Sequence, residues 1–212
     1  MPTRREFIQR GAILPALAAF GPTAHLAYAE GADGTRDIRQ WAHRTFRILF
    51  DDSSDEGAAF GARARRLGAA VLPVRPALGT VWMNVIEPHL KREPTALAGL
   101  IDGPSLFCLE LLGRDYGMGI VYRVEHATTA AGRVRHSVTG AQPLAGWPSW
   151  KDRLDAAGDR WSALAADLAL TCPATLRPDA RVELLDLAPR REAIDRTLYS
   201  WVIAPTGRVR FC

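Results

Sequence analysis

The sequence predicts an α/β fold with a mainly parallel sheet built from βαβ units and an antiparallel hairpin at the edge of that sheet. Two short apolar runs at 45–50 and 69–74 flank a segment of helical periodicity, and such a unit implies parallel strands. Two further runs, at 120–126 and 133–139, are separated by a short loop that ends in Gly132, which is typical of a hairpin. Because 48% of the 212 residues are hydrophobic, the chain can bury a substantial core.

The first βαβ unit begins with the strand at 45–50, which is closed by Asp51-Asp52-Ser53. Ser53 and Glu56 have the spacing of a capping box, so we expect a helix that begins there. Gly68 should end this helix, and the strand at 69–74 follows it.

The next segment predicts two more helices around a third strand. Thr80 could cap a helix that Pro88 ends or kinks. The strand at 95–101 then leads into Asp102-Gly103-Pro104-Ser105, which favours the start of a helix that ends at 113–117.

Beyond the hairpin, the sequence predicts one long amphipathic helix. Ser149 and Asp152 repeat the capping spacing, and apolar residues continue along one helical face at Trp150, Leu154, Ala157, Trp161, Leu164 and Leu168. We expect this stripe to lie on the sheet of its own domain, because two exposed tryptophans would favour aggregation. Contact with a partner protein is the alternative.

The C-terminal part of the chain contains three apolar segments. Residues 182–187 predict a strand, and residues 198–204 and 208–211 flank Pro205-Thr206-Gly207. Two strands around such a turn predict a terminal β-hairpin.

The N-terminus carries the pattern of an export signal. Thr3-Arg4-Arg5-Glu6-Phe7-Ile8 is followed by a moderately apolar stretch at 11–20 and by small residues at Ala27 and Ala29. Arg4, Arg5 and Phe7 resemble the (S/T)-R-R-x-F-(L/I) signature of bacterial proteins exported through the twin-arginine pathway. This resemblance implies export to the periplasm in a folded state, with the twin-arginine translocase and signal peptidase as partners.

Cleavage after Ala29 would leave residues 30–212 as a single α/β domain of about 183 residues. An ordinary amphipathic N-terminal helix is the alternative, although Pro15, Gly21 and Pro22 would break it. The apolar stretch is shorter than the ~20 residues that span a bilayer, so we expect no permanent membrane span.

Charge and cysteine content narrow the possible functions. The formal net charge of the whole chain is +4, and removal of the signal leaves about +2, which is too little to indicate a nucleic-acid partner. Cys172 and Cys212 are the preferred disulfide pair in an oxidising compartment. A reactive Cys212 is the alternative. Cys108 lies in an apolar run and is expected to be a buried free thiol.

Ligands of open parallel sheets bind beyond the carboxyl ends of the strands. Two helix N-termini would point free N–H groups into this crevice and favour an anionic group. The alternative role of the acidic and serine side chains at these ends is helix capping and turn formation. The candidate ligand-binding residues are Asp51, Asp52, Arg75, Gly103 and Ser105.

A catalytic reading of the same crevice uses Ser105 as nucleophile, His126 as base and Asp102 as the carboxylate. The sequence around Ser105 lacks the G-x-S-x-G pattern of a nucleophile elbow. A metal site is a further alternative, because His126 and His136 oppose each other directly if the hairpin loop has three residues.

The sequence has no G-x-G-x-x-G, Walker loop or C-x-x-C-H, and it assigns no cofactor. The leading hypothesis is therefore a non-catalytic periplasmic protein, either an accessory subunit with a periplasmic partner or a small-molecule-binding module. A small hydrolase or transferase and a metal-binding protein are the alternatives.

Overall fold

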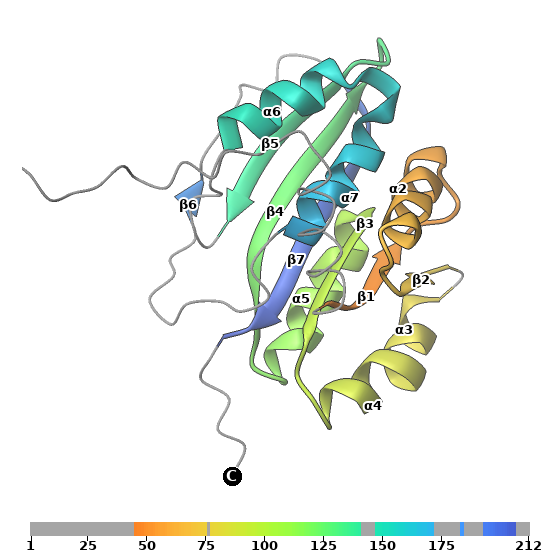
Figure 1. Cartoon of the computed structure of the whole chain (residues 1–212), viewed down its shortest axis with the longest axis vertical. Helices are drawn as coiled ribbons and strands as arrows, with labels where there is room; N and C mark the ends of the chain where they lie inside the picture. Colours follow the sequence, from red (N-terminus) through yellow and green to blue (C-terminus); the bar gives the residue numbers. More distant parts are fainter. Residues whose placement is uncertain (1–44, 76, 141–146, 172–182, 185–192, 207–212) are drawn as a thin grey trace, which may run out of the picture.

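The fold is a twisted β-sheet with helices on both faces (Figure 1). The computed structural model describes residues 45–75, 77–140, 147–171, 183–184 and 193–206. In these residues, seven strands pair in the order β2-β1-β3-β7-β4-β5-β6. Their bounds are β1 Thr45–Phe50, β2 Val71–Pro73, β3 Ala96–Asp102, β4 Met118–Thr129, β5 Val134–Gly140, β6 Glu183–Leu184 and β7 Ile194–Pro205.

The sheet is mixed rather than mainly parallel. The strands β2, β1 and β3 form a parallel group, as the βαβ pattern predicted. The strand β7 then lies between β3 and β4 and runs antiparallel to both. The predicted pairing of β4 and β5 as a hairpin is confirmed. Its predicted place at the edge of the sheet is not, because β6 pairs with the other side of β5.

The C-terminal segments differ from the predicted terminal hairpin. Its first arm, predicted at 198–204, belongs to the longer β7 in the interior of the sheet. Its second arm, at 208–211, lies outside the described residues. Of the strand predicted at 182–187, the structure describes only Glu183–Leu184, which pairs with β5.

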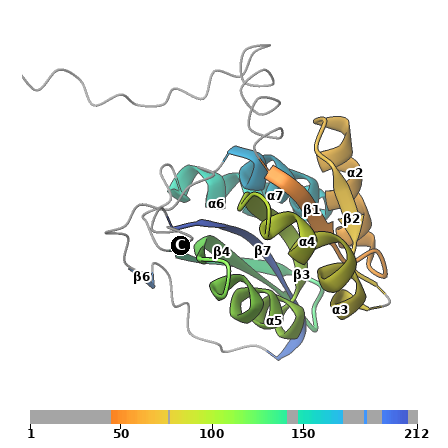
Figure 2. The same ribbon diagram turned by 90° about the horizontal axis from the view of Figure 1, so that it is seen from below.

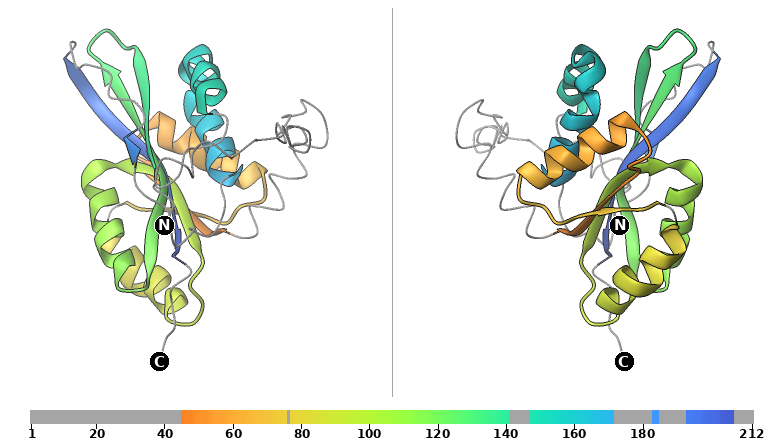
Figure 3. Two further views of the ribbon diagram at one scale, coloured as in Figure 1. Left: turned by 90° about the vertical axis from the view of Figure 1, so that its left-hand side faces the viewer. Right: turned by 90° about the vertical axis from the view of Figure 1, so that its right-hand side faces the viewer.

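The helices form two layers, one on each face of the sheet (Figures 2 and 3). The bounds of the helices are α2 Asp55–Arg66, α3 Leu78–Val81, η1 Trp82–Ile86, α4 Glu87–Leu90, α5 Gly103–Arg114, α6 Trp147–Ala156, η2 Gly158–Arg160 and α7 Trp161–Thr171. The helices α2, α6 and α7 cover one face, and α3, α4 and α5 cover the other.

Each layer closes a separate apolar core, because side chains alternate between the two faces along every strand. Tyr122, Val124 and Val202 pack in the core below α2, α6 and α7. Trp201 and Ile203 pack in the core below α5 and η1. Residues of β4 and β7 that face α6 and α7 are therefore separated from α5 by the sheet itself.

The first helix begins one residue later than the capping pattern predicted. The N-cap is Ser54, whose Oγ accepts from the Gly57 N–H at 3.0 Å. Ser53 donates instead to Asp51, from both its N–H and its hydroxyl. Gly68 follows the helix with φ of 91°, a conformation that glycine adopts without strain.

Pro88 does not end the helical segment in which it lies. The segment starts after Ala77 rather than at Thr80, and it continues through α3, η1 and α4 to Leu90. Because Pro88 has no N–H to donate, the wider π-turn of η1 directly before α4 accommodates the missing helical hydrogen bond.

The predicted long helix is two helices. Gly158, with φ of 52°, ends α6, and the short η2 turn leads into α7. The apolar stripe nevertheless lies on the sheet of its own domain as expected, since Trp150 and Trp161 are 3% and 2% exposed.

Two further properties of the helices bear on the sequence analysis. Cys108 is exposed on α5 and is a free thiol, so the prediction that it is buried is wrong. Phe107 beside it is exposed as well, which shows that this apolar run also covers the outer face of α5.

Within the described ranges, no helix is long and apolar enough to cross a bilayer. Cys172 and Cys212 lie outside these ranges.

Candidate functional site

The hairpin of β4 and β5 places two histidines in direct opposition. The Thr129 N–H donates to the Arg133 carbonyl at 2.8 Å, so the loop consists of the three residues Ala130-Ala131-Gly132. With this loop length, His126 pairs with His136 across the strands. The sequence predicted this register as the condition for a histidine pair.

The two histidines belong to a buried chain of polar side chains. The Nδ1 atoms of His126 and His136 are 2.7 Å apart, and Nε2 of His126 is 2.8 Å from Oγ of Ser200 on β7. These three side chains are at most 2% exposed. The ring of Trp161 stacks on His126 with 4.2 Å between the ring centroids. Trp161, the first residue of α7, therefore covers His126 in this group of polar side chains.

The hydrogen bonds assign the tautomers of both rings. His136 donates to the Leu154 backbone, so its Nδ1 carries the lone pair that faces His126. The Nδ1 atom of His126 must then carry the proton, and its Nε2 accepts from the Ser200 hydroxyl. Every polar atom of the chain is satisfied when both imidazoles are neutral.

Burial keeps the imidazoles neutral at physiological pH. Burial lowers the pKa of His136 from 6.5 to about 4, although the Asp155 carboxylate partly opposes this effect. Burial also lowers the pKa of His126 well below its ordinary value, and the neighbouring His136 adds to the shift. Removal of an imidazolium from water is the dominant cost in both cases.

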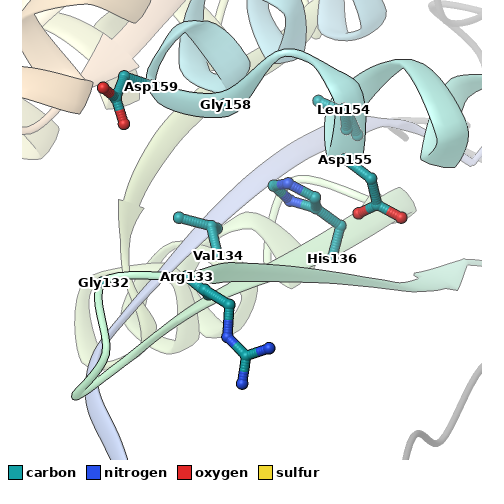
Figure 4. Close-up of a pocket in the computed structure, with 8 residues that line it drawn as sticks. All are labelled: Gly132, Arg133, Val134, His136, Leu154, Asp155, Gly158 and Asp159. Atoms are coloured by element: carbon teal, nitrogen blue, oxygen red, sulfur yellow. The ribbon is translucent and has the colours of Figure 1, made fainter.

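A pocket of about 330 Å³ opens directly above this pair. It lies between the β5 end of the hairpin and the C-terminal end of α6 (Figure 4). Val134 and His136 point from β5 towards the helix, Leu154 faces them from α6, and Arg133 points away. This volume is at the lower end of the range for small-molecule sites.

The charged groups that face the pocket are acidic. Asp155 on α6 and Asp159 on η2 line it at separate positions (Figure 4). Lys151, one turn before Asp155, donates to Oδ2 of that carboxylate at 2.7 Å. A ligand would approach Asp155 through its Oδ1 atom, while Asp159 supplies a second carboxylate.

The acidic residues at the strand ends hold local turns. Asp51 is 6% exposed and accepts from Ser53 and from Nε of Arg75. Burial raises the pKa of the Asp51 carboxyl, but these hydrogen bonds outweigh it and the net shift is downward. Asp52 is exposed in the adjoining turn. This arrangement corresponds to the turn role that the sequence analysis left open for Asp51.

The third strand end has a similar local role. Asp102 is the N-cap of α5 and accepts from the Ser105 N–H at 2.7 Å. Gly103 lies against the Tyr199 ring, which a Cβ at this position would approach to 3.1 Å. Asp102 thus acts as the helix cap that was the alternative to ligand contact.

The structure does not bring Ser105 and His126 together as a catalytic pair. Ser105 belongs to α5, which covers one face of the sheet, whereas His126 is buried under Trp161 on the opposite face. Both nitrogens of His126 are also already hydrogen-bonded. The sheet between the two faces therefore excludes proton transfer from Ser105 to His126.

The geometry of the histidine pair is that of a hydrogen bond. Two nitrogens at about 2.0 Å from a tetrahedral zinc ion would be roughly 3.3 Å apart, whereas the Nδ1 atoms are separated by 2.7 Å. Across the described ranges, no group of three or more His, Cys, Asp or Glu side chains could hold a metal ion. The pair accordingly does not form a metal centre in this arrangement.

Three parts of this site are not predicted from the sequence: Ser200, Trp161 as a site residue, and the pocket. Ser200 could have been identified from its position between Leu198 and Val202, where a polar residue occupies the inward face of an apolar strand. No local pattern could reveal that β7 would place this hydroxyl beside His126.

Comparisons with protein-family models, with curated proteins and with solved structures find no match to this chain. The pocket and the buried polar side chains beneath it are therefore the features from which a function can be inferred.

Proposed function

We propose that this chain is a periplasmic small-molecule-binding module, and that its ligand binds in the pocket between β5 and α6. The observation that carries this proposal is the 330 Å³ pocket over the buried, fully hydrogen-bonded His136. Pockets of this size that combine apolar side chains with a few fixed polar groups are the usual setting of ligand sites. The module binds its ligand without chemical conversion.

The charges at the pocket favour a ligand with a positive group. His136 is neutral at pH 7 because burial lowers its pKa, and the Arg133 side chain points away from the pocket. Asp155 and Asp159 are then the charged groups that a ligand meets. Val134 and Leu154 offer apolar contact to the body of the same molecule. A short aliphatic amine or diamine has this combination of groups.

The proposed location rests on the export signal. Arg4, Arg5 and Phe7 match the twin-arginine signature, and Ala27 and Ala29 match a cleavage site. Residues 1–44 lie outside the described structure. In this proposal, the translocase and signal peptidase act on the chain before the mature domain binds its ligand.

An accessory-subunit role is the second candidate, and a different surface supports it. The stripe of Trp150 and Trp161 is buried against the sheet and does not offer a contact surface. Phe107 and Leu111, one turn apart on α5, are 65% and 53% exposed. They provide an apolar surface that a periplasmic partner could cover.

Three probes of similar length and different charge test the binding proposal: 1,4-diaminobutane, 1,4-butanediol and succinate. We expect the diamine to bind with a dissociation constant on the order of 1 mM, given its six non-hydrogen atoms. Ligand-observed NMR at pH 7 measures this directly. If none of the probes binds, the proposed function is wrong.

A pair of tryptophan variants locates the binding site. Val134→Trp fills the pocket and should abolish binding, because Val134 lines it. Val71→Trp is the matched control, since Val71 is also a half-buried strand residue that packs against the same core, at the opposite end of the sheet. Binding that survives Val134→Trp would place the ligand elsewhere.

A further inference from the structure

The polar chain of Ser200, His126 and His136 can accept one extra proton but not two. If His136 becomes an imidazolium, its Nδ1–H must donate to Nδ1 of His126. His126 must then carry its proton on Nε2 and donate to the Ser200 hydroxyl. A second proton would place two N–H groups against each other at 2.7 Å.

The charged groups around His136 do not compensate for the hydration that a buried imidazolium loses. The Asp155 carboxylate of α6 favours the imidazolium, while the Lys151 ammonium of the same helix opposes it. From the other elements, Trp161 of α7 contacts both rings, Ser200 of β7 bonds His126, and Asp159 of η2 lines the pocket. Burial remains the largest influence on His136.

The helix α6 covers His136 and can separate from α7 at Gly158. Leu154 of α6 is fully buried above the ring. The helix α6 ends at Ala156, two residues before Gly158, whose φ is 52°. Beyond this glycine, α7 is held to α2 by the ion pair of Arg63 with Asp167, in which Nε and Nη2 reach the two carboxylate oxygens at 2.7 and 3.2 Å. The helix α6 can therefore leave the sheet while α7 stays in place.

We propose that α6 is an acid-released lid over the pocket: uptake of a proton by His136 favours a state in which α6 detaches from β5 and turns about Gly158. The detached state exposes His136 to water, where an imidazolium costs little. Since Leu154 and Asp155 leave together with α6, the pocket loses one wall. The consequence, release of a bound ligand at acid pH, rests on the proposed function. The opening itself does not.

The size of the effect follows from the pKa of His136 in the open state and its pKa in the closed state. A histidine that titrates near 6.5 in the open state and at about 4 in the closed state shifts the opening equilibrium roughly twentyfold between pH 7 and pH 5.

Native-state hydrogen exchange of the protein without ligand tests the lid. After correction for the intrinsic pH dependence of exchange, we expect the amides of α6 to exchange roughly twentyfold faster at pH 5 than at pH 7. The amides of α7 and α5 should stay more strongly protected than those of α6 at both pH values, because they exchange only when the whole fold opens. Equal protection of α6 at the two pH values would overturn the proposal. Protection of α6 equal to that of α5 and α7 at pH 5 would also overturn it, because α6 would then open only together with the whole fold.

Two variants assign the effect to the buried chain. The triple variant His126→Leu, His136→Leu, Ser200→Ala removes its polar groups together and should make α6 exchange independent of pH in this window. The control His89→Gln removes a titrating histidine that bonds Thr95 in another part of the fold and should leave the response intact. If the pH response disappears in the His89→Gln variant, the effect belongs to His89 instead. Since no ligand is present, failure here is distinct from failure of the binding proposal.

Discussion

The buried histidine pair predicts a loss of global stability between pH 7 and pH 5. In the folded protein, burial lowers the pKa of His136 from 6.5 to about 4, so the unfolded chain binds more protons in this range. The contribution of neutral His136 to stability is fully present above pH 6.5, the pKa of histidine in the unfolded chain. It is lost as the pH falls towards 4. The pKa of His126 is lowered by burial as well, and its contribution has the same sign.

The expected magnitude comes from His136 alone. Integration over the two pKa values gives a decrease of about 2 kcal/mol in the free energy of unfolding from pH 7 to pH 5. The full effect, reached below pH 4, is about 3 kcal/mol. Both are large fractions of the stability of an ordinary domain.

Urea unfolding at several pH values, followed by tryptophan fluorescence, measures this decrease. The signal comes from the six tryptophans, one of which, Trp161, stacks on His126 in the folded state. In the triple variant His126→Leu, His136→Leu, Ser200→Ala, the free energy of unfolding should lose most of its pH dependence. Apolar side chains replace all three members of the hydrogen-bonded group, so none of its members is left buried without a partner. A wild-type free energy of unfolding that is equal at pH 5 and pH 7 would refute the reasoning.

Two further predictions concern the fold and the export signal. Gly57→Ala should destabilise the protein by about 3 kcal/mol in urea unfolding, because a Cβ there would overlap the Asp51 carbonyl oxygen; Gly79→Ala, where a Cβ meets open space on α3, should be neutral or stabilising by about 0.5–1 kcal/mol. If both substitutions cost the same, the close approach at Gly57 is not the cause. Arg4→Lys combined with Arg5→Lys should block export, measured by cell fractionation. Accumulation of this double variant in the periplasm at the wild-type level would contradict the twin-arginine assignment.

Local sequence patterns predicted the elements better than their order. The strand at 45–50, the helix that follows it and the strand near 69–74 could be predicted, because the signals are local: short apolar runs, a capping serine and a glycine beyond the helix. The hairpin register of His126 and His136 was predictable for the same reason, since loop length fixes it. In these regions, residues within one turn or one loop decide the structure.

The position of β7 could not be predicted in this way. Its residues read as the first arm of a terminal hairpin, yet the strand lies between β3 and β4. Strand order depends on which apolar faces meet in three dimensions, and no residue of β7 encodes its neighbours. The break at Gly158 was missed because the apolar periodicity continues through it from Leu154 to Trp161, which hides the change of direction.

The candidate site was predictable only in part. The histidine pair was visible from the sequence, but its third member, Ser200, lies 74 residues from His126. The pocket requires α6 to pack across β5, which depends on the same unpredicted arrangement. The strand-end residues Asp51 and Asp102 instead adopt the turn and cap roles that their sequence neighbours favour.

The most direct test of the central claim is the ¹⁵N imidazole spectrum of the protein at pH 7, recorded with and without 1,4-diaminobutane. Because His136 forms the floor of the pocket, its resonances should shift as the diamine is added, and those of His126 should follow through their shared hydrogen bond. The resonances of His89, which bonds Thr95 away from the pocket, should stay in place. Unchanged His136 resonances at saturating diamine, or equal shifts at His89, would contradict a ligand site between β5 and α6.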